Sequence, residues 1–78
     1  MKKIQILGTD CPKCRLLAEI VERAARELGL RYELQKVTDL SEILRFGVMV
    51  PPALVVDGSV RVSGRVPSLE ETKKLLSD

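Results

Sequence analysis

Hydrophobic residues along this chain follow two periods, one typical of strands and one typical of helices. Residues 3–7 alternate apolar and polar side chains and lead into Gly8-Thr9-Asp10, a turn composition, so they predict a strand. Between residues 14 and 28 the apolar positions recur every three to four residues, and Gly29 follows as a helix-ending residue. This segment is the clearest helix in the sequence. Its apolar side consists of Cys14, Leu17, Ala18, Val21, Ala24, Ala25 and Leu28.

The rest of the chain predicts two more helices and three more strands. Residues 31–37 alternate like an edge strand with one wet face, while residues 53–56 are continuously apolar, as expected of a central strand. Asp57-Gly58 predicts a tight hairpin turn into a strand over residues 59–62. Capping boxes at residues 39–42 and 68–71 predict the starts of two helices. We expect the first to end near Gly47 and the last to bury Leu69, Leu75 and Leu76.

Length and composition limit the architecture and the partners. Seventy-eight residues predict a single domain over residues 1–78, and Tyr32 and Phe46 as the only aromatic residues leave an aliphatic core. The net charge of +2 comes from 13 basic and 11 acidic residues mixed along the chain, which argues against nucleic acid as a partner. The N-terminal apolar run, residues 4–7, is much shorter than a signal peptide or a membrane span. We therefore expect a cytoplasmic protein with no membrane insertion.

The two cysteines, Cys11 and Cys14, stand where the strand pattern gives way to the helix pattern. With Cys11 as the N-cap and Pro12 at the first helical position, the thiols can close a small disulfide ring, and the helix N-terminus favours the thiolate. In the cytoplasm such a pair is more often catalytic or metal-binding than structural. The chain has no histidine, which excludes Cys-His catalysis, and two thiolates are too few for structural zinc unless two chains share it. We expect no cofactor and no resident metal.

The order strand, helix, strand, helix, strand, strand, helix, with CxxC after the first strand and proline before the third, resembles the thioredoxin-like fold in its glutaredoxin-sized form. More narrowly, residues 8–14, 52–58 and 64–68 resemble the small prokaryotic proteins called redox-active disulfide protein 2. The resemblance implies a three-layer α/β/α domain around a four-stranded mixed sheet. A strand joined to its neighbour through a helix should lie parallel to it, and the hairpin strands antiparallel.

The resemblance also implies a function and roles for three residues. It implies a thiol-disulfide oxidoreductase or electron-transfer protein, with Cys11 as the attacking thiol, Cys14 as the resolving thiol and Pro52 as a cis-proline facing the disulfide. The partner would be a protein disulfide or dithiol, with a thioredoxin reductase as one candidate reductant, and the chain would act as a monomer. Asp10 stands where thioredoxin has tryptophan, and Gln5 is the only internal polar residue of the first strand. We therefore expect a narrower range of partners than that of thioredoxin itself.

Two basic residues suggest which partners fit. Arg65 follows Gly64 where glutaredoxins often have a second glycine, so glutathione is a less expected partner. Lys13 lies within the CxxC motif, and together with Pro51 and Arg65 it predicts a surface near Cys11 that selects acidic or neutral partners.

Two other functions use the same cysteines. Residues 6–14 also resemble the loop of small copper and mercury carriers, in which soft thiolates bind Cu(I). Those carriers have an early hairpin and end in a strand, whereas this chain predicts a late hairpin and a final capped helix. The difference favours the redox interpretation. A module that only senses redox state through its disulfide, without turnover, is the third possibility.

Overall fold

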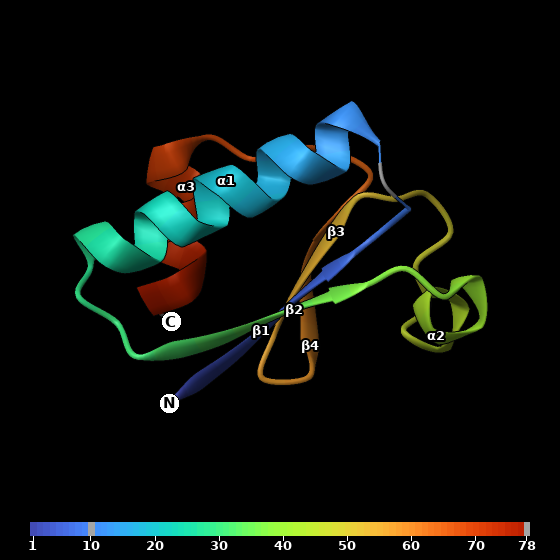
Figure 1. Ribbon diagram of the computed structural model, residues 1–78, viewed down its shortest axis with the longest axis horizontal. Helices are drawn as coiled ribbons and strands as arrows, with labels where there is room; N and C mark the ends of the chain where they lie inside the picture. The colour runs from blue at the N-terminus through green and yellow to red at the C-terminus, as the bar shows by residue number, and fades with distance from the viewer. Residues whose placement is uncertain (10, 78) are drawn as a thin grey trace.

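The computed structural model describes residues 1–9 and 11–77 as four strands and three helices (Figure 1). The strands and helices follow one another in the predicted order. In sequence they are β1 (Lys2–Leu7), α1 (Pro12–Glu27), β2 (Tyr32–Val37), α2 (Leu40–Arg45), β3 (Ala53–Val56), β4 (Ser59–Ser63) and α3 (Leu69–Ser77). In this part of the chain, no helix combines the length and the apolar character needed to cross a membrane.

The strands form one mixed sheet in the order β2-β1-β3-β4. β1 and β2, joined through α1, are parallel, as expected for a helical crossover between neighbours. Helix α2 connects β2 to β3. β3 lies on the other side of β1 from β2 and runs antiparallel to β1. Only the connection through α1 therefore joins two neighbouring parallel strands. The predicted edge position of β2, the inner position of β3 and the antiparallel hairpin of β3 and β4 are confirmed.

The main core lies between one face of the sheet and helices α1 and α3. Helix α1 contributes alanine, leucine and valine side chains to this core, and Leu76 of α3 is fully buried in it. Leu69 and Leu75 are half-buried and pack against this core, while Leu28, expected inside, is the helix C-cap and is 37% exposed. The buried members are Ile4, Ile6, Leu17, Ala18, Val21, Ala24, Ala25, Leu54, Val56, Val62 and Leu76.

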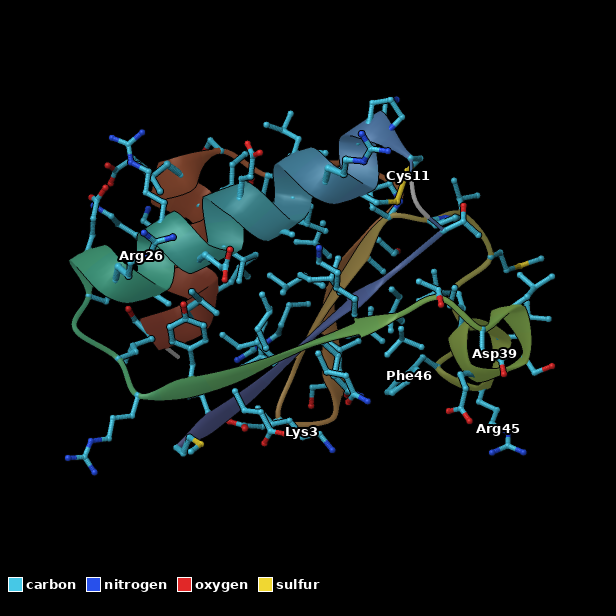
Figure 2. All side chains as sticks on the ribbon, in the orientation of Figure 1. Lys3, Cys11, Arg26, Asp39, Arg45 and Phe46 are labelled. Atoms are coloured by element: carbon cyan, nitrogen blue, oxygen red, sulfur yellow. A yellow bond between two sulfur atoms is a disulfide. The ribbon has the colours of Figure 1, made fainter. Side chains whose placement is uncertain are left out.

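A smaller core on the opposite face explains where α2 lies. Ile43 of α2 and Val48 pack against Leu7, Val37 and the strand β3, so α2 covers only the end of the sheet where β1 and β2 terminate (Figure 1). Figure 2 shows Phe46 on the sheet side of this helix, where it packs against the same core. The third layer of the α/β/α arrangement is therefore a single short helix near the carboxyl end of β1.

The predicted turns and caps follow from local chemistry. Asp57 and Gly58 both have positive φ, +50° and +85°, which is the conformation required in a two-residue hairpin turn. Asp39 is the N-cap of α2, and its carboxylate accepts a hydrogen bond of 2.9 Å from the Ser41 amide. The left-handed conformation of Gly29, with φ +67°, ends α1 as predicted.

Candidate redox site

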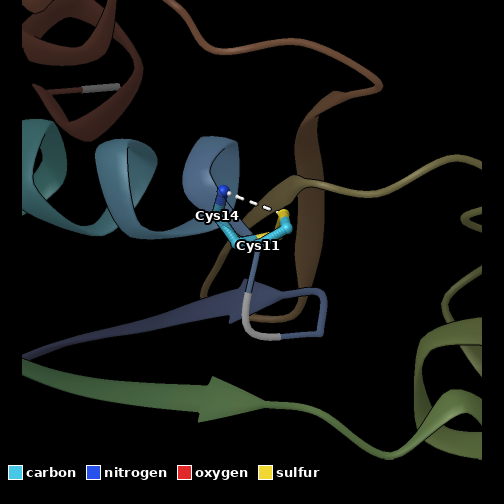
Figure 3. The surroundings of a disulfide bond; sticks show 2 residues. All are labelled: Cys11 and Cys14. Atoms are coloured by element: carbon cyan, nitrogen blue, oxygen red, sulfur yellow. Dashed lines mark hydrogen bonds between the residues drawn. A yellow bond between two sulfur atoms is a disulfide. The ribbon is translucent and has the colours of Figure 1, made fainter.

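Cys11 is the N-cap of α1 and Pro12 begins the helix, as the sequence predicts. The Cys11 backbone is extended, with φ −111° and ψ 161°, and its sulfur accepts a hydrogen bond of 3.2 Å from the backbone N–H of Cys14 (Figure 3). Pro12 has no N–H to leave unpaired in this first turn. Figure 2 shows Cys11 at the opposite end of α1 from Arg26, so its sulfur lies at the positive end of the helix.

Cys11 and Cys14 form a disulfide, with their Cα atoms 5.2 Å apart. The two sulfurs differ in environment. Cys14 faces the core side of α1 and is only 7% exposed, whereas Cys11 is partly exposed at the helix end. The pair therefore has one accessible sulfur at a helix N-terminus and one shielded sulfur, which is the arrangement expected of a dithiol exchange site.

The loop between β1 and α1 requires glycine where it meets the buried cysteine. A Cβ placed on Gly8 would come within 2.5 Å of the Cys14 sulfur and within 3.4 Å of the Pro51 Cβ. Gly8 also has φ +154°, which side chains with a Cβ rarely adopt. The backbone N–H of Gly8 donates to the Val37 carbonyl oxygen at 2.9 Å, which ties the loop to the end of β2. Asp10, the neighbour of Cys11, lies outside the described residues.

The segment before β3 forms the other wall of the site. The peptide bond between Pro51 and Pro52 is cis, as predicted, and Pro52 is buried while Pro51 is exposed. Figure 3 shows the chain that leads into β3 beside the disulfide, in agreement with the short distance from Pro51 to the Gly8 position. The Pro52 carbonyl oxygen accepts a hydrogen bond of 2.9 Å from the Gly64 amide, so the loop after β4 is joined to the same wall.

An ion pair that the sequence did not predict holds this last loop. Arg65 donates two hydrogen bonds to the carboxylate of Glu71, one of them at 2.9 Å from Nη1 to Oε1 and the other from Nη2 to Oε2. These hydrogen bonds raise the pKa of Arg65 and lower the pKa of Glu71, since they favour both charged forms. Ser68 caps α3 by accepting from the Glu71 amide at 3.2 Å, but the Glu71 carboxylate does not complete the predicted capping box.

This pairing changes the expected charge of the surface. Arg65 and Glu71 compensate each other, so Arg65 does not add a net positive charge near the disulfide. Lys13 remains exposed in the first turn of α1. Among residues 1–9 and 11–77, no three histidine, cysteine, aspartate or glutamate side chains are grouped so as to hold a metal ion.

Comparisons with known proteins agree with this geometry. Residues 2–77 match the thioredoxin domain family. The chain is 44% identical over 77 residues to a thioredoxin from Methanothermobacter thermautotrophicus, covering 99% of this chain and 100% of that protein. It is 43% identical over 76 residues to a thioredoxin from Methanocaldococcus jannaschii, covering 97% of this chain and 87% of that protein.

A solved structure supports the fold independently. The structure of thioredoxin-2, described as a component of malaria parasite protein secretion machinery, superimposes with a TM-score of 0.74 over 99% of this chain and 82% of its own, at 15% identity. At this identity the likeness concerns the fold alone. The predicted resemblance to small prokaryotic thioredoxin-like proteins is confirmed by the family match and the full-length relatives: this chain belongs to the thioredoxin domain family.

Proposed function

We propose that this thiol-disulfide oxidoreductase exchanges disulfides with protein partners, with Cys11 as the attacking thiol and Cys14 as the resolving thiol. The observation that carries the assignment is the difference between the two sulfurs. Cys11 accepts a hydrogen bond from the Cys14 amide at the helix N-terminus, which favours its thiolate, while Cys14 is 7% exposed. An attacking thiol must be ionised and accessible, and a resolving thiol needs only to reach its neighbour.

The exchange proceeds in two balanced steps. The Cys11 thiolate attacks one sulfur of a partner disulfide, so that a mixed disulfide forms and the other partner sulfur leaves as a thiolate. Cys14 then loses its proton to water and attacks the Cys11 sulfur, which restores the Cys11–Cys14 disulfide and releases the second partner thiolate. The partner gains two electrons and the protein loses two. A reductant restores the dithiol, and a thioredoxin reductase is our candidate.

Exposed apolar residues in the segment before the proline pair supply the proposed docking surface for the partner chain. Met49 is 87% exposed and Val50 is 62% exposed, just before the proline pair, and Pro12, which follows Cys11, is exposed as well. Val50 lies next to Gly64, where a Cβ would come within 3.9 Å of the Val50 side chain. A partner segment that lies across this surface would contact mainly apolar groups and Lys13. We accordingly expect neutral or acidic partners.

The chain order speaks against a copper or mercury carrier as the second candidate. Such carriers have an early hairpin and a strand after their last helix, whereas here the hairpin joins β3 to β4 and α3 follows it. A redox sensor would use the same cysteines without turnover. We propose that the protein is a cytoplasmic monomer that catalyses repeated rounds of disulfide exchange. This catalysis is the property that separates it from a sensor.

Three measurements test the proposal together. The first is the mass of the protein with and without a dithiol reductant, which should differ by two hydrogen atoms with no intermolecular species. The second is the reduction potential of the pair. The third is turnover with a thioredoxin reductase and with glutathione as alternative reductants. A pair that forms no intramolecular disulfide would refute the redox function, and a reversible pair without turnover would favour the sensor.

A further inference from the structure

We propose that the ion pair between Arg65 and Glu71 positions the wall of the redox site on which a partner protein docks. The wall segment consists of residues 50–52, directly before β3. The inference rests on the proposed function, because it concerns how a partner disulfide is brought to Cys11. Arg65 and Glu71 are positioning residues: they act through the backbone of the loop after β4 and not on the sulfurs.

The backbone of Gly64 holds the wall segment from the side of β4. In the β3–β4 register Ala53 pairs with Ser63, so Pro52 stands opposite Gly64 one residue further along. The Gly64 N–H donates to the Pro52 carbonyl oxygen at 2.9 Å, and a Cβ on Gly64 would lie 3.8 Å from the Val50 carbonyl oxygen. Proline has no N–H to return a second hydrogen bond, so this pair makes one where an ordinary pair makes two. The position of Gly64 therefore determines that of the wall segment through a single hydrogen bond.

Arg65 is anchored to helix α3, which fixes the residue next to Gly64. Its forked guanidinium donates to both carboxylate oxygens of Glu71, so the orientation of the pair is set as well as its distance. Glu71 lies in the first turn of α3, and its own amide donates to the Ser68 hydroxyl oxygen at 3.2 Å. Thr72, the next residue of the helix, is fully buried. The ion pair thus ties the loop to a helix that is packed on the main core.

Burial does not hold this part of the loop. Residues 63–65 are exposed, whereas Pro67, on the α3 side of the loop, is fully buried. The side chains of Arg65 and Glu71 are 56% and 38% exposed, so their pair contributes little to the stability of the whole domain. A contribution of this size still changes a local opening equilibrium by about fivefold. The pair is therefore suited to holding the loop without deciding whether the domain folds.

Correct placement of the wall segment matters for a protein disulfide and much less for a small one. A partner chain must lie across the wall segment to bring its disulfide to Cys11, whereas a small disulfide needs only the partly exposed sulfur. The hydrogen bond from the Cys14 amide that favours the Cys11 thiolate lies at the start of α1 and involves neither Arg65 nor Glu71. Loss of the ion pair should therefore slow exchange with proteins and leave the intrinsic reactivity of Cys11 unchanged.

Two disulfides of different size test this difference. The reduced protein is mixed with insulin or with 2-hydroxyethyl disulfide, and its oxidation is timed by acid quenching and alkylation. We expect Arg65→Gln and Glu71→Gln each to slow the reaction with insulin about fivefold and to change the reaction with 2-hydroxyethyl disulfide by less than about twofold. The double variant should be no slower than either single variant, because both substitutions remove the same pair. Arg65→Lys retains the charge without the forked geometry, so its rate should lie between those of the wild type and Arg65→Gln.

The two single variants also separate positioning from surface charge. Arg65→Gln removes a positive charge and Glu71→Gln removes a negative one, so an electrostatic effect on a charged partner would have opposite signs in the two variants. Loss of the pair acts in the same direction in both. An unchanged rate with insulin, opposite effects of the two variants, or equal slowing with both disulfides would overturn the proposal.

Amide hydrogen exchange measures the link to the wall segment itself. The Gly64 amide should exchange about fivefold faster in Arg65→Gln and in Glu71→Gln than in the wild type. The Gly8 amide, which donates to the Val37 carbonyl oxygen at 2.9 Å, should keep its exchange rate in both variants. An unchanged exchange rate of Gly64 would refute this inference while leaving the oxidoreductase intact.

Lys73→Gln is the matched control, because Lys73 belongs to the same helix and pairs with Glu27 of α1 at 2.6 Å. It removes an ion pair of α3 that does not involve the loop after β4. We expect it to change neither the exchange rate of Gly64 nor the reaction with insulin, and equal effects of Lys73→Gln and Arg65→Gln would overturn the proposal. A wild-type protein that neither disulfide oxidises would refute the proposed function itself.

Discussion

Gly8 lies directly against the sulfur of Cys14, so close that a Cβ on Gly8 would be 2.5 Å from it. The turn residue before the motif and the second cysteine of the motif thus define one contact, although six positions separate them in the sequence. The contact involves the sulfur in its disulfide form. Any side chain at position 8 must therefore act on the balance between the oxidised and reduced protein.

Gly8→Ala should destabilise the protein by ~2 kcal/mol through overpacking and backbone strain, and more in the oxidised than in the reduced state. A reduced Cys14 can rotate away from the new methyl group, whereas the disulfide holds the sulfur in place. The reduction potential should accordingly rise by roughly 30 mV for each ~1.4 kcal/mol of difference between the two states. Equilibration with a dithiol buffer measures the potential, and thermal unfolding measures the stability.

Gly47→Ala is the matched control for Gly8. Gly47 has φ +79° and open space around the position of a Cβ, so the substitution adds backbone strain without touching a sulfur. It should lower the stability of both redox states equally and leave the potential unchanged. The same potential in Gly8→Ala and the wild type would contradict the role of this contact.

Cys11 should be the first thiol to react with an alkylating reagent at neutral pH, and Cys14→Ser should accumulate mixed disulfides with partners. The reason is that Cys11 is partly exposed at the helix N-terminus, while Cys14 is 7% exposed. Tryptic mapping of the reduced protein after brief alkylation distinguishes the two sites. Cys11→Ser is the control and should trap no protein partner. Faster alkylation of Cys14 would reverse the proposed roles.

Pro52→Ala should slow the release of partners and let the reduced protein bind Cd²⁺, because we expect the buried proline ring to shield the cysteine pair. The lifetime of the mixed disulfide and the ultraviolet absorption of cadmium thiolates report these two effects. Pro67→Ala is a control, since Pro67 is equally buried but belongs to the segment before α3. If both variants bind Cd²⁺ equally well, a general loss of packing explains the binding, and Pro52 does not shield the cysteine pair.

The local features of the site and of the fold could be predicted from sequence because neighbouring residues determine them. Cys11 as N-cap, Pro12 at the first helical position and the turn at Asp57-Gly58 each follow from the chemistry of two to four consecutive residues. The buried side of α1 follows from its period, apart from its last member, Leu28, which lies past the final turn.

The features that were missed depend on residues brought together by the fold. Glu71 has the spacing of a capping box with Ser68, but Arg65 supplies a stronger, charged partner for its carboxylate. Thr72 gave no apolar signal, yet it is fully buried because its hydroxyl donates to the Ser68 carbonyl at 2.8 Å. A pocket beside Cys14 has no sequence motif, since its lining comes from β1, the loop after it, α1 and the end of β2.

Glu27→Gln should lower the melting temperature at neutral pH, and the difference from the wild type should disappear in acid. Glu27 of α1 accepts from Lys73 of α3 at 2.6 Å and from Arg23 at 2.8 Å, and these hydrogen bonds lower its pKa. A carboxyl with a lowered folded pKa contributes stability that is present above its ordinary value near 4.5 and lost as the pH falls through the lower folded value. Glu19→Gln, on the exposed side of the same helix, is the control. Equal melting temperatures at neutral pH would show that the ion pairs contribute nothing.

Reduction of insulin by dithiothreitol should be at least ~tenfold slower with this protein than with an ordinary thioredoxin. The chain has no tryptophan to stand beside Cys11. Gln5, the polar side chain within β1, is hydrogen-bonded to Gln35 at 3.2 Å, and an amide cannot take up a proton as a carboxylate does. Proton transfer to and from Cys14 would then depend on water or on Asp10, which is a slower route than a positioned acid. Catalysis at the rate of an ordinary thioredoxin would refute the narrow partner range, whereas weak catalysis together with a fully reversible disulfide is the expected result.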